Sequence, residues 1–231
     1  MIQVFYIRIQ DIPSQAAEVE KLMTVLPLQA IRKLDNISNM PNKLRSALGE
    51  ILTRYAIQNV TGIGAKTLEV SYGTNGKPYL EKHPDVHFNI SHSGDYIVCA
   101  VSGVEVGIDV ERCRAYNPGI AERFFSKPEY ADLMRLEEDA RRDYFFTLWT
   151  IKESYLKALG RGLTKSLGSF TVTADDSGFR ISGETSAADY SVFSDALPGD
   201  YKLAVSYKSA LRPVQIREVT LHEISLLFTG L

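Results

Sequence analysis

Two short acidic segments carry the side chains best suited to chemistry. Asp109 and Glu111 stand at alternate positions among aliphatic residues in segment 106–111. Successive side chains of a β-strand point to opposite faces, so both carboxylates would share one face while their aliphatic neighbours enter a core. A hard cation such as Mg²⁺ commonly takes one or two carboxylates together with the phosphates of a substrate. For an isolated pair of acids, a solvated strand face is the simpler interpretation.

The second segment, 149–157, places a third carboxylate among lysines on an expected helix. An α-helix turns by about 100° per residue, so Glu153 and Lys157 share a face while Lys152 lies about 100° from Glu153. Glu153 and Lys157 can therefore serve one site from adjacent turns. An ordinary i,i+4 ion pair would explain the same spacing, with Trp149 as a core residue. Taken together, the two acidic segments favour a site for a metal ion and a polyphosphate.

A third polar segment, 89–94, reads Asn-Ile-Ser-His-Ser-Gly and lies between two expected strands. Ser91, His92 and Ser93 could bind phosphate through hydroxyls, an imidazole and backbone N–H groups. A hairpin turn with hydroxyl caps is the alternative. A Ser–His nucleophile is not favoured, because the members of such a triad usually come from separate segments.

Apolar periodicity predicts the elements that must position these residues. Helices are predicted over 14–26, 41–60, 118–125, 127–136 and 140–159, and strands over 4–9, 68–72, 86–90, 96–102, 104–111, 169–174, 179–182, 190–194, 201–207 and 216–221. Helices interspersed with antiparallel strands indicate an α+β fold.

One internal repeat is visible. The sequence Gly-Asp-Tyr occurs at 94–96 and again 105 positions later at 199–201, each time before a strand that ends in Ala-Val-Ser. A coincidence between strand-rich segments is the alternative. If the repeat is real, the chain consists of two similar halves, 1–103 and 104–231, and the acidic strand opens the second half at the interface. Clefts between such units are favoured positions for ligand sites.

Composition sets the broad class. The chain has 231 residues, of which 45% are hydrophobic and 23% charged, as expected for a globular protein with a full core. A formal net charge of −2 gives no global basic footprint for nucleic acid. Two cysteines are too few for a disulfide framework. The absence of a leader-like start and of a long apolar run predicts a cytoplasmic protein without a membrane segment.

With these motifs in place, and with segment 124–130 between them, the chain resembles the 4′-phosphopantetheinyl transferases of the Sfp (surfactin-synthetase-activating) type. The motifs are Gly-Ile-Asp-Val-Glu at 107–111 and Trp-x-x-Lys-Glu-x-x-x-Lys at 149–157, and the resemblance covers nearly the whole chain. It implies two similar halves related by a pseudo-twofold, with the active site in the cleft between them, in a monomer. The implied reaction moves the 4′-phosphopantetheine arm of coenzyme A to a serine of an apo carrier-protein domain and releases adenosine 3′,5′-bisphosphate.

The resemblance also implies roles for individual residues. The Mg²⁺ ligands would be Asp109, Glu111 and Glu153. The coenzyme A contacts would be Lys33, Gly76, Lys77, Pro78, Ser91, His92, Ser93, Lys152 and Lys157. The catalytic residues would be Glu153, Lys157, Glu129 and His92. The serine proton would pass to Glu153, to Glu129 or to a metal-bound water held by Glu111.

Two further expectations concern the 3′-phosphate and the docking of the carrier protein. A second basic position of the family for the 3′-phosphate falls on Ala30, with Arg32 as the candidate replacement. The carrier protein is expected to dock along 116–130 and along the helix at 145–162. The nature of the carrier, which could serve peptide, polyketide or fatty-acid synthesis, is left open.

Two other functional classes fit parts of the pattern. A magnesium-dependent pyrophosphohydrolase would share the acids and lysines but need no carrier surface. A non-catalytic coenzyme A or carrier-binding module would tolerate loss of the metal ligands, so the complete acid set disfavours it.

Overall fold

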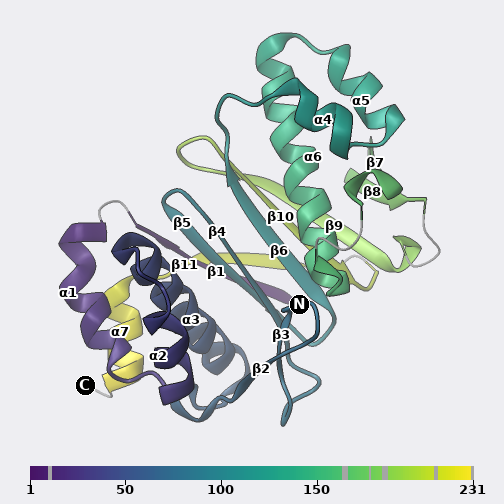
Figure 1. The fold of residues 1–231 in the computed structure, drawn as a ribbon. Coiled ribbons are helices and arrows are strands. Elements are labelled where there is room, and N and C mark those ends of the chain that lie inside the picture. The colour runs from purple at the N-terminus through teal and green to yellow at the C-terminus, as the bar shows by residue number, and fades with distance from the viewer. Residues whose placement is uncertain (10–11, 163–165, 177, 184–186, 211–212, 230–231) are drawn as a thin grey trace.

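Two β-sheets pack face to face between two groups of helices (Figure 1). This computed structural model describes residues 1–9, 12–162, 166–176, 178–183, 187–210 and 213–229. One sheet has the strand order β11-β1-β5-β4 and the other the order β6-β10-β9. The fold is therefore α+β, as the sequence predicts.

The two sheets belong to two units with the same order of elements. The first unit contains β1 (Ile2–Arg8), α1 (Ile12–Met23), α2 (Leu28–Asp35), α3 (Met40–Thr61), β2 (Val70–Tyr72), β3 (Pro78–Leu80), β4 (His87–Ser93) and β5 (Tyr96–Ser102). The second contains β6 (Val106–Arg112), α4 (Pro118–Phe124), α5 (Lys127–Met134), α6 (Glu138–Leu159), β7 (Thr171–Asp175), β8 (Gly178–Ser182), β9 (Tyr190–Leu197) and β10 (Tyr201–Lys208). Each unit thus runs strand, two shorter helices, a 22-residue helix, a two-stranded hairpin and an antiparallel pair. The prediction of two similar halves is confirmed.

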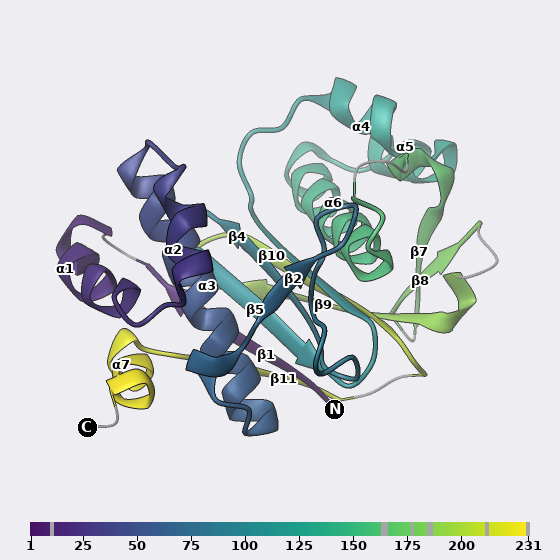
Figure 2. The same cartoon turned by 60° about the horizontal axis from the view of Figure 1, so that its bottom comes forward.

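The end of the chain returns to the first unit. β11 (Val214–Glu218) pairs in parallel with β1, and α7 (Leu221–Thr229) lies beside α1 (Figures 1 and 2). The expectation that 104–231 forms one half is therefore wrong for these two elements, because β1 offers an edge that β11 completes. The strand predicted over 216–221 is also shifted: Thr220 and Glu223 cap each other reciprocally, which starts a helix there.

The sequence prediction misses helix α2 and strand β3, while the strand predicted over 68–72 is confirmed as β2. Helix α2 has eight residues, buries only Ala30 and Leu34, and is preceded by Pro27 without a side-chain cap. Such a short helix gives little periodic signal. The strands β2 and β3 have three residues each, of which only Val70 and Leu80 are buried.

The core between the sheets follows the period of two expected for strands. Alternate residues of β5 and β6 enter it: Tyr96, Val98, Ala100, Val106, Ile108 and Val110. The opposite face of β5 packs in the cluster that includes helix α3. In the part of the chain that the structure describes, no helix has the length and apolar character needed to cross a bilayer.

The repeated Gly-Asp-Tyr sequences meet in this central core. The Tyr96 and Tyr201 rings lie 4.7 Å apart, edge to face. The Tyr96 hydroxyl donates to the carbonyl of Pro198 at 3.0 Å, and the backbone N–H of Asp95 donates to the Tyr201 hydroxyl at 2.9 Å. Each tyrosine therefore bonds to the turn of the other unit.

Strand β6 also approaches helix α6 closely, at Gly107. A Cβ atom added to Gly107 would lie 2.1 Å from the carbonyl oxygen of Ser154 and 2.3 Å from the backbone nitrogen of Ala158. The obstacles are backbone atoms, so no side chain can rotate away. Gly107 therefore sets the distance between the acidic strand and the helix that carries Glu153.

We expect Gly107→Ala to destabilise the protein by at least about 3 kcal/mol, because the new methyl group must push helix and strand apart. Urea denaturation would measure this loss. Gly103→Ala is the matched control, since the nearest atom to its added Cβ would be 4.0 Å away. Equal stability of the two variants would contradict the proposed contact.

Candidate active site

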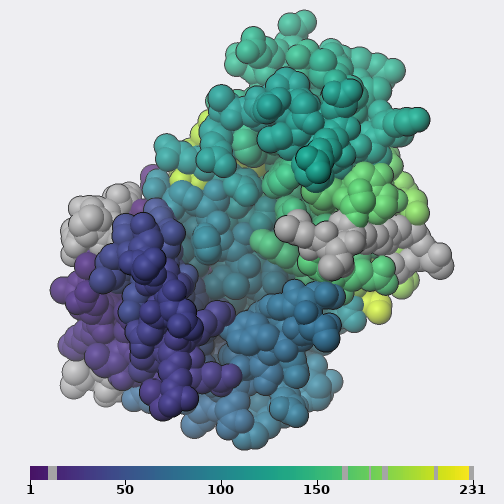
Figure 3. All heavy atoms as spheres, in the orientation of Figure 1, coloured from purple at the N-terminus to yellow at the C-terminus, as the bar shows by residue number. Residues whose placement is uncertain are grey.

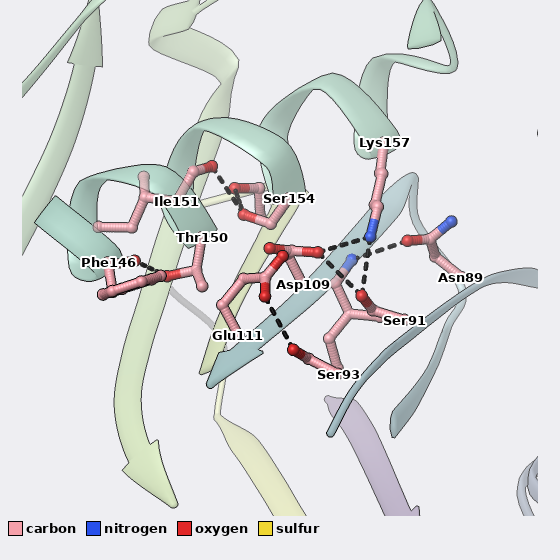
Figure 4. Close-up of polar contacts among 12 residues, drawn as sticks. Asn89, Ser91, Ser93, Asp109, Glu111, Phe146, Thr150, Ile151, Ser154 and Lys157 are labelled. Atoms are coloured by element: carbon pink, nitrogen blue, oxygen red, sulfur yellow. Dashed lines mark hydrogen bonds and ion pairs between the residues drawn. The ribbon is translucent and has the colours of Figure 1, made fainter. Parts of the chain in front are cut away.

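Two serines of β4 hold the two acids of β6. The Ser91 hydroxyl donates to Oδ1 of Asp109 and the Ser93 hydroxyl donates to Oε2 of Glu111, both at 2.8 Å (Figure 4). Asp109 and Glu111 therefore share one face of β6 while the aliphatic residues between them are buried in the central core. The predicted face is confirmed, and the serines act here as supports of the acids.

Helix α6 brings the third acid and a lysine to the same place. The ammonium of Lys157 lies 2.6 Å from Oδ1 of Asp109 and 2.9 Å from the Ser91 hydroxyl (Figure 4). Glu153, one turn earlier on α6, interacts electrostatically with Asp109, Lys157 and Glu111. The structure thus brings together Asp109, Glu111, Glu153 and Lys157, which the sequence predicted as one site.

Glu111 and Glu153 lie in surroundings that disfavour their negative charge. Burial, and after it the charge of Asp109, raise the pKa of Glu111 and of Glu153. Lys157 opposes both shifts as the nearby cation. A further positive charge among these acids would relieve the remaining repulsion.

The acid set fits a magnesium ion that also takes ligands from its substrate. Oδ2 of Asp109 is buried and has no hydrogen-bond partner among the described residues, so one oxygen is free to bind a cation. In that same part of the chain, no group of three or more His, Cys, Asp or Glu side chains forms a ready-made metal cage. Mg²⁺ usually keeps waters and substrate phosphates as ligands, so an incomplete protein set is what it requires.

A cavity of about 370 Å³ opens beside Lys157 and has walls from both units. It contains six of the predicted coenzyme A contacts: Lys33, Gly76, Lys77, Pro78, His92 and Lys157. In Figure 3, the purple and blue atoms of the first unit and the green atoms of the second flank a teal central strip. This cavity is a cleft between the halves, rich in positive charge, next to the acids.

His92 lines this cavity, and Arg45 lies near enough to it for their charges to interact. Partial burial and the charges of Lys157 and Arg45 lower the pKa of His92, so the imidazole is neutral at pH 7. The Nε atom of Arg45 is buried without a partner among the described residues. The helical pattern could not indicate that Arg45 lies near His92, because these two residues are far apart in the sequence.

Lys77 connects the β2–β3 hairpin to the end of helix α6. Its ammonium donates to the carbonyl of Ala158 at 2.5 Å and to that of Val106 at 3.3 Å. Burial lowers the pKa of Lys77 to about 8. The side chain therefore closes one wall of the cavity and keeps an incompletely paired charge there.

Lys33 and the residues around it form a smaller annex of the cavity. The Lys33 ammonium donates to the Tyr72 hydroxyl at 2.8 Å. Lys33, Ala30 and Tyr72 line a hollow of about 150 Å³. Arg32, the candidate replacement for a basic residue at Ala30, is exposed and lines neither this hollow nor the main cavity.

The structure does not bring Glu129 and Lys152 to the site. They form a fully buried ion pair of 2.8 Å. Lys152 also donates to the carbonyls of Leu167 and Phe170, and Glu129 accepts from the backbone N–H groups of Ser126 and Val172. The expected roles of Lys152 as a coenzyme contact and of Glu129 as a proton acceptor are therefore corrected, because every strong interaction of the pair lies inside the second unit.

Helix α3 supplies further cavity walls that the sequence did not indicate. Its contributions are Ser46, Gly49, Glu50 and Thr53; the end of β2 adds Tyr72, and other segments add Asn75, Gly160 and Gly162. The helix was predicted, but its cavity face carries small and polar residues that resemble an ordinary partly buried surface. Only the packing of the two units shows that this surface faces a cavity.

Lys77 gives the protein a defined pH dependence. Its pKa falls from 10.5 to about 8 on folding, so the buried charge costs stability at pH 7. As the pH rises from 8 to 10.5, the folded state releases this proton first and the cost disappears. We expect the free energy of unfolding of the wild type to rise, relative to Lys77→Met, by up to about 3 kcal/mol over this range.

Urea denaturation at pH 7 and pH 10 would measure the difference between the wild type and Lys77→Met. The exposed Lys66→Met variant controls for the loss of one lysine charge. A difference that stays constant, or that falls with pH, would show that Lys77 is not held in a charge-disfavouring position.

The buried ion pair predicts a large and specific loss of stability. Lys152→Met leaves the Glu129 carboxylate buried without its cation, and we expect a loss of about 3–5 kcal/mol. Asp132→Asn, which breaks the exposed pair with Arg135, should cost less than about 1 kcal/mol. Denaturant unfolding measures both. If Lys152→Met were stable and only raised the KM for coenzyme A, Lys152 would contact the substrate after all.

Two family models match most of the chain. The model of the 4′-phosphopantetheinyl transferase superfamily matches residues 105–206, and the model of the 4′-phosphopantetheinyl transferase N-terminal region matches residues 13–103. The holo-[acyl-carrier-protein] synthase structure of Thermotoga maritima aligns with a TM-score of 0.41 at 20% identity, over 47% of this chain and 65% of that chain.

Two curated relatives come from Bacillus subtilis. One 4′-phosphopantetheinyl transferase is 37% identical over 197 residues, which are 84% of this chain and 88% of that protein. The 4′-phosphopantetheinyl transferase Sfp of strain 168 is 36% identical over 168 residues, which are 73% of this chain and 75% of that protein. With the acids, the lysine and the cleft arranged as described, this chain belongs to the 4′-phosphopantetheinyl transferase superfamily.

Proposed function

We propose that this transferase moves the 4′-phosphopantetheine arm of coenzyme A to the serine of an apo carrier-protein domain, with Mg²⁺ as its cofactor. One observation carries the proposal: the three acids and Lys157 border a positively charged cavity between the two units. A pyrophosphate at the acids would extend naturally into a nucleotide in that cavity. The 3′-phosphate and the adenosine would meet Lys33, Lys77 and His92.

Asp109, Glu111 and Glu153 would hold the metal ion. Asp109 offers its unpaired Oδ2, and Glu111 and Glu153 offer carboxylates whose charge the surroundings disfavour. When bound, Mg²⁺ would neutralise charge on the pyrophosphate oxygens as the phosphorus is attacked. Ser91 and Ser93 keep the two strand acids in position.

The reaction requires a new bond from the serine oxygen to the β-phosphorus of coenzyme A. The bond between that phosphorus and the oxygen bridging to adenosine 3′,5′-bisphosphate breaks, and the leaving group takes the bond electrons. Lys157 supplies a fixed positive charge for the oxygens on which negative charge grows. In the structure the Lys157 ammonium forms an ion pair with Asp109, so it lies beside the acids at which the pyrophosphate would bind.

The serine must also lose its proton. The buried ion pair of Glu129 with Lys152 argues against Glu129 as the acceptor. Glu153 and a water held by Glu111 are the remaining candidates, and both carboxylates belong to the acid cluster. A base near the attacking oxygen accelerates such a transfer by typically 10²–10⁴-fold.

The carrier protein would dock on the second unit, along 116–130 and the helix at 145–162. A single copy is sufficient for the reaction, since one chain supplies both walls of the cleft. Both cysteines are free and buried, which fits action in the reducing cytoplasm. The choice among carriers of peptide, polyketide and fatty-acid synthesis does not affect the assay below, which needs only one carrier that is accepted.

Incubation with coenzyme A, Mg²⁺ and an apo carrier protein, followed by intact-mass measurement, tests the proposal. The carrier should gain one phosphopantetheine, and adenosine 3′,5′-bisphosphate should appear in equal amount. Release of the nucleotide without any carrier would instead support a magnesium-dependent pyrophosphohydrolase. Binding of coenzyme A without formation of any product would support a non-catalytic binding module.

Variants of the acids should separate metal binding from coenzyme binding. Asp109→Asn and Glu153→Gln should reduce transfer by at least about 10³-fold at any Mg²⁺ concentration, since each removes a charge that would bind the ion. Lys77→Ala should mainly raise the KM for coenzyme A. The exposed Glu137→Gln is the control for loss of an acid. Full activity of Asp109→Asn would refute the metal assignment.

A further inference from the structure

The turn between β4 and β5 lies next to one of the three acids. Ser93, the last residue of β4, donates to Oε2 of Glu111 at 2.8 Å (Figure 4). The same hydroxyl accepts from the backbone N–H of Arg112 at 3.2 Å. Gly94 and Asp95 follow Ser93 and form the turn. The place of this turn therefore determines whether Ser93 can reach Glu111.

Tyr201 of strand β10 ties this turn to the second unit. Its hydroxyl accepts from the backbone N–H of Asp95 at 2.9 Å. A Cβ atom added to Gly94 would lie 2.1 Å from the same hydroxyl, so the end of the tyrosine packs directly on the turn backbone. Tyr201 is 2% exposed, and a hydrogen bond shielded from water is stronger than one at the surface. The turn therefore has little freedom to move away from β10.

The same tyrosine is in register with the acidic strand. In the antiparallel pair of β10 and β6, Tyr201 lies opposite Arg112, the residue after Glu111. These contacts form a closed ring. From Arg112 the ring crosses to Tyr201 and passes through its hydroxyl to Asp95. It then follows the turn to Ser93, which bonds back to Arg112 and also holds Glu111. The bonds of such a network support one another, so the loss of one weakens the rest.

We infer that Tyr201 is a positioning residue for the proposed metal site: its hydroxyl holds the β4–β5 turn so that Ser93 can fix the Glu111 carboxylate in place. The inference rests on the proposed function, because it needs Glu111 as a ligand of the cation. Loss of a group that orients a metal ligand typically weakens metal binding about 10- to 100-fold. Tyr201 acts one bond further from the ligand than Ser93, so we expect a smaller effect from it.

The internal repeat supplies a matched control for Tyr201. Tyr96 is its counterpart in the first unit and is equally buried, at 1% exposed. The Tyr96 hydroxyl donates to the carbonyl of Pro198 at 3.0 Å, in the turn between β9 and β10. Tyr96→Phe and Tyr201→Phe each remove one buried hydroxyl from the same aromatic pair. If Tyr201 only stabilised the fold, the two variants would behave alike.

Amide hydrogen exchange of the metal-free protein tests the first step. The backbone N–H of Arg112 is the donor to Ser93, so it reports whether the turn stays in place. It should exchange faster in Tyr201→Phe than in the wild type and stay protected in Tyr96→Phe. Equal protection in the wild type and Tyr201→Phe would show that the hydroxyl does not hold the turn, and would overturn the inference.

Binding of Mn²⁺ in the presence of coenzyme A, followed by the electron paramagnetic resonance signal of the free ion, tests the second step. Tyr201→Phe should weaken binding about three- to tenfold, and Tyr96→Phe less than about twofold. In a Ser93→Ala protein, Tyr201→Phe should cause no further loss, since both act through one bond.

Equal losses in the two tyrosine variants, or additive losses from Tyr201→Phe and Ser93→Ala, would overturn the inference and leave the proposed function intact. If the wild type itself bound no Mn²⁺, the metal assignment of the proposed function would fail, and the inference with it.

Discussion

The active site depends on a seam of side-chain hydrogen bonds between the edge strands β4 and β6. These strands belong to different sheets. Asn89 accepts from the backbone N–H of Ile108 at 2.9 Å, and Ser93 accepts from that of Arg112 at 3.2 Å. Ser91, between them, bonds to Asp109. Polar side chains at every second position of β4 thus satisfy the free edge of β6, and the same bonds fix the acids.

Helix α6 fixes the position of the remaining groups of the site relative to that seam. Its close approach to Gly107 sets the depth of the helix against β6, and the buried pair of Lys152 and Glu129 ties its far side to α5 and β7. The packing of α6 therefore holds Glu153 and Lys157 beside the seam without any bound ligand. Crowding three carboxylates in this place costs stability, and the well-packed helix offsets that cost.

The sequence was sufficient to predict which side chains share a face wherever the period of a strand or a helix determines that face. Alternation on β6 predicted that Asp109 and Glu111 share a face, and the helical period predicted that Glu153 and Lys157 do. The helical period placed Lys152 about 100° from Glu153, but it could not reveal a buried acid as its partner, because charged residues are rarely fully buried. The approach of Arg45 to His92 and the return of β11 to β1 depend on contacts between distant segments, which no local pattern contains.

The pairing of β11 with β1 explains why a duplicated fold carries one site. In the second unit, the first strand, β6, leaves one edge outside its sheet, and that edge forms the seam with β4. In the first unit, the corresponding edge of β1 is occupied by β11. The C-terminal strand therefore breaks the internal symmetry of the molecule. Because β11 covers that edge, β1 cannot form a second seam, and the first unit instead supplies one wall of the cavity beside the acids.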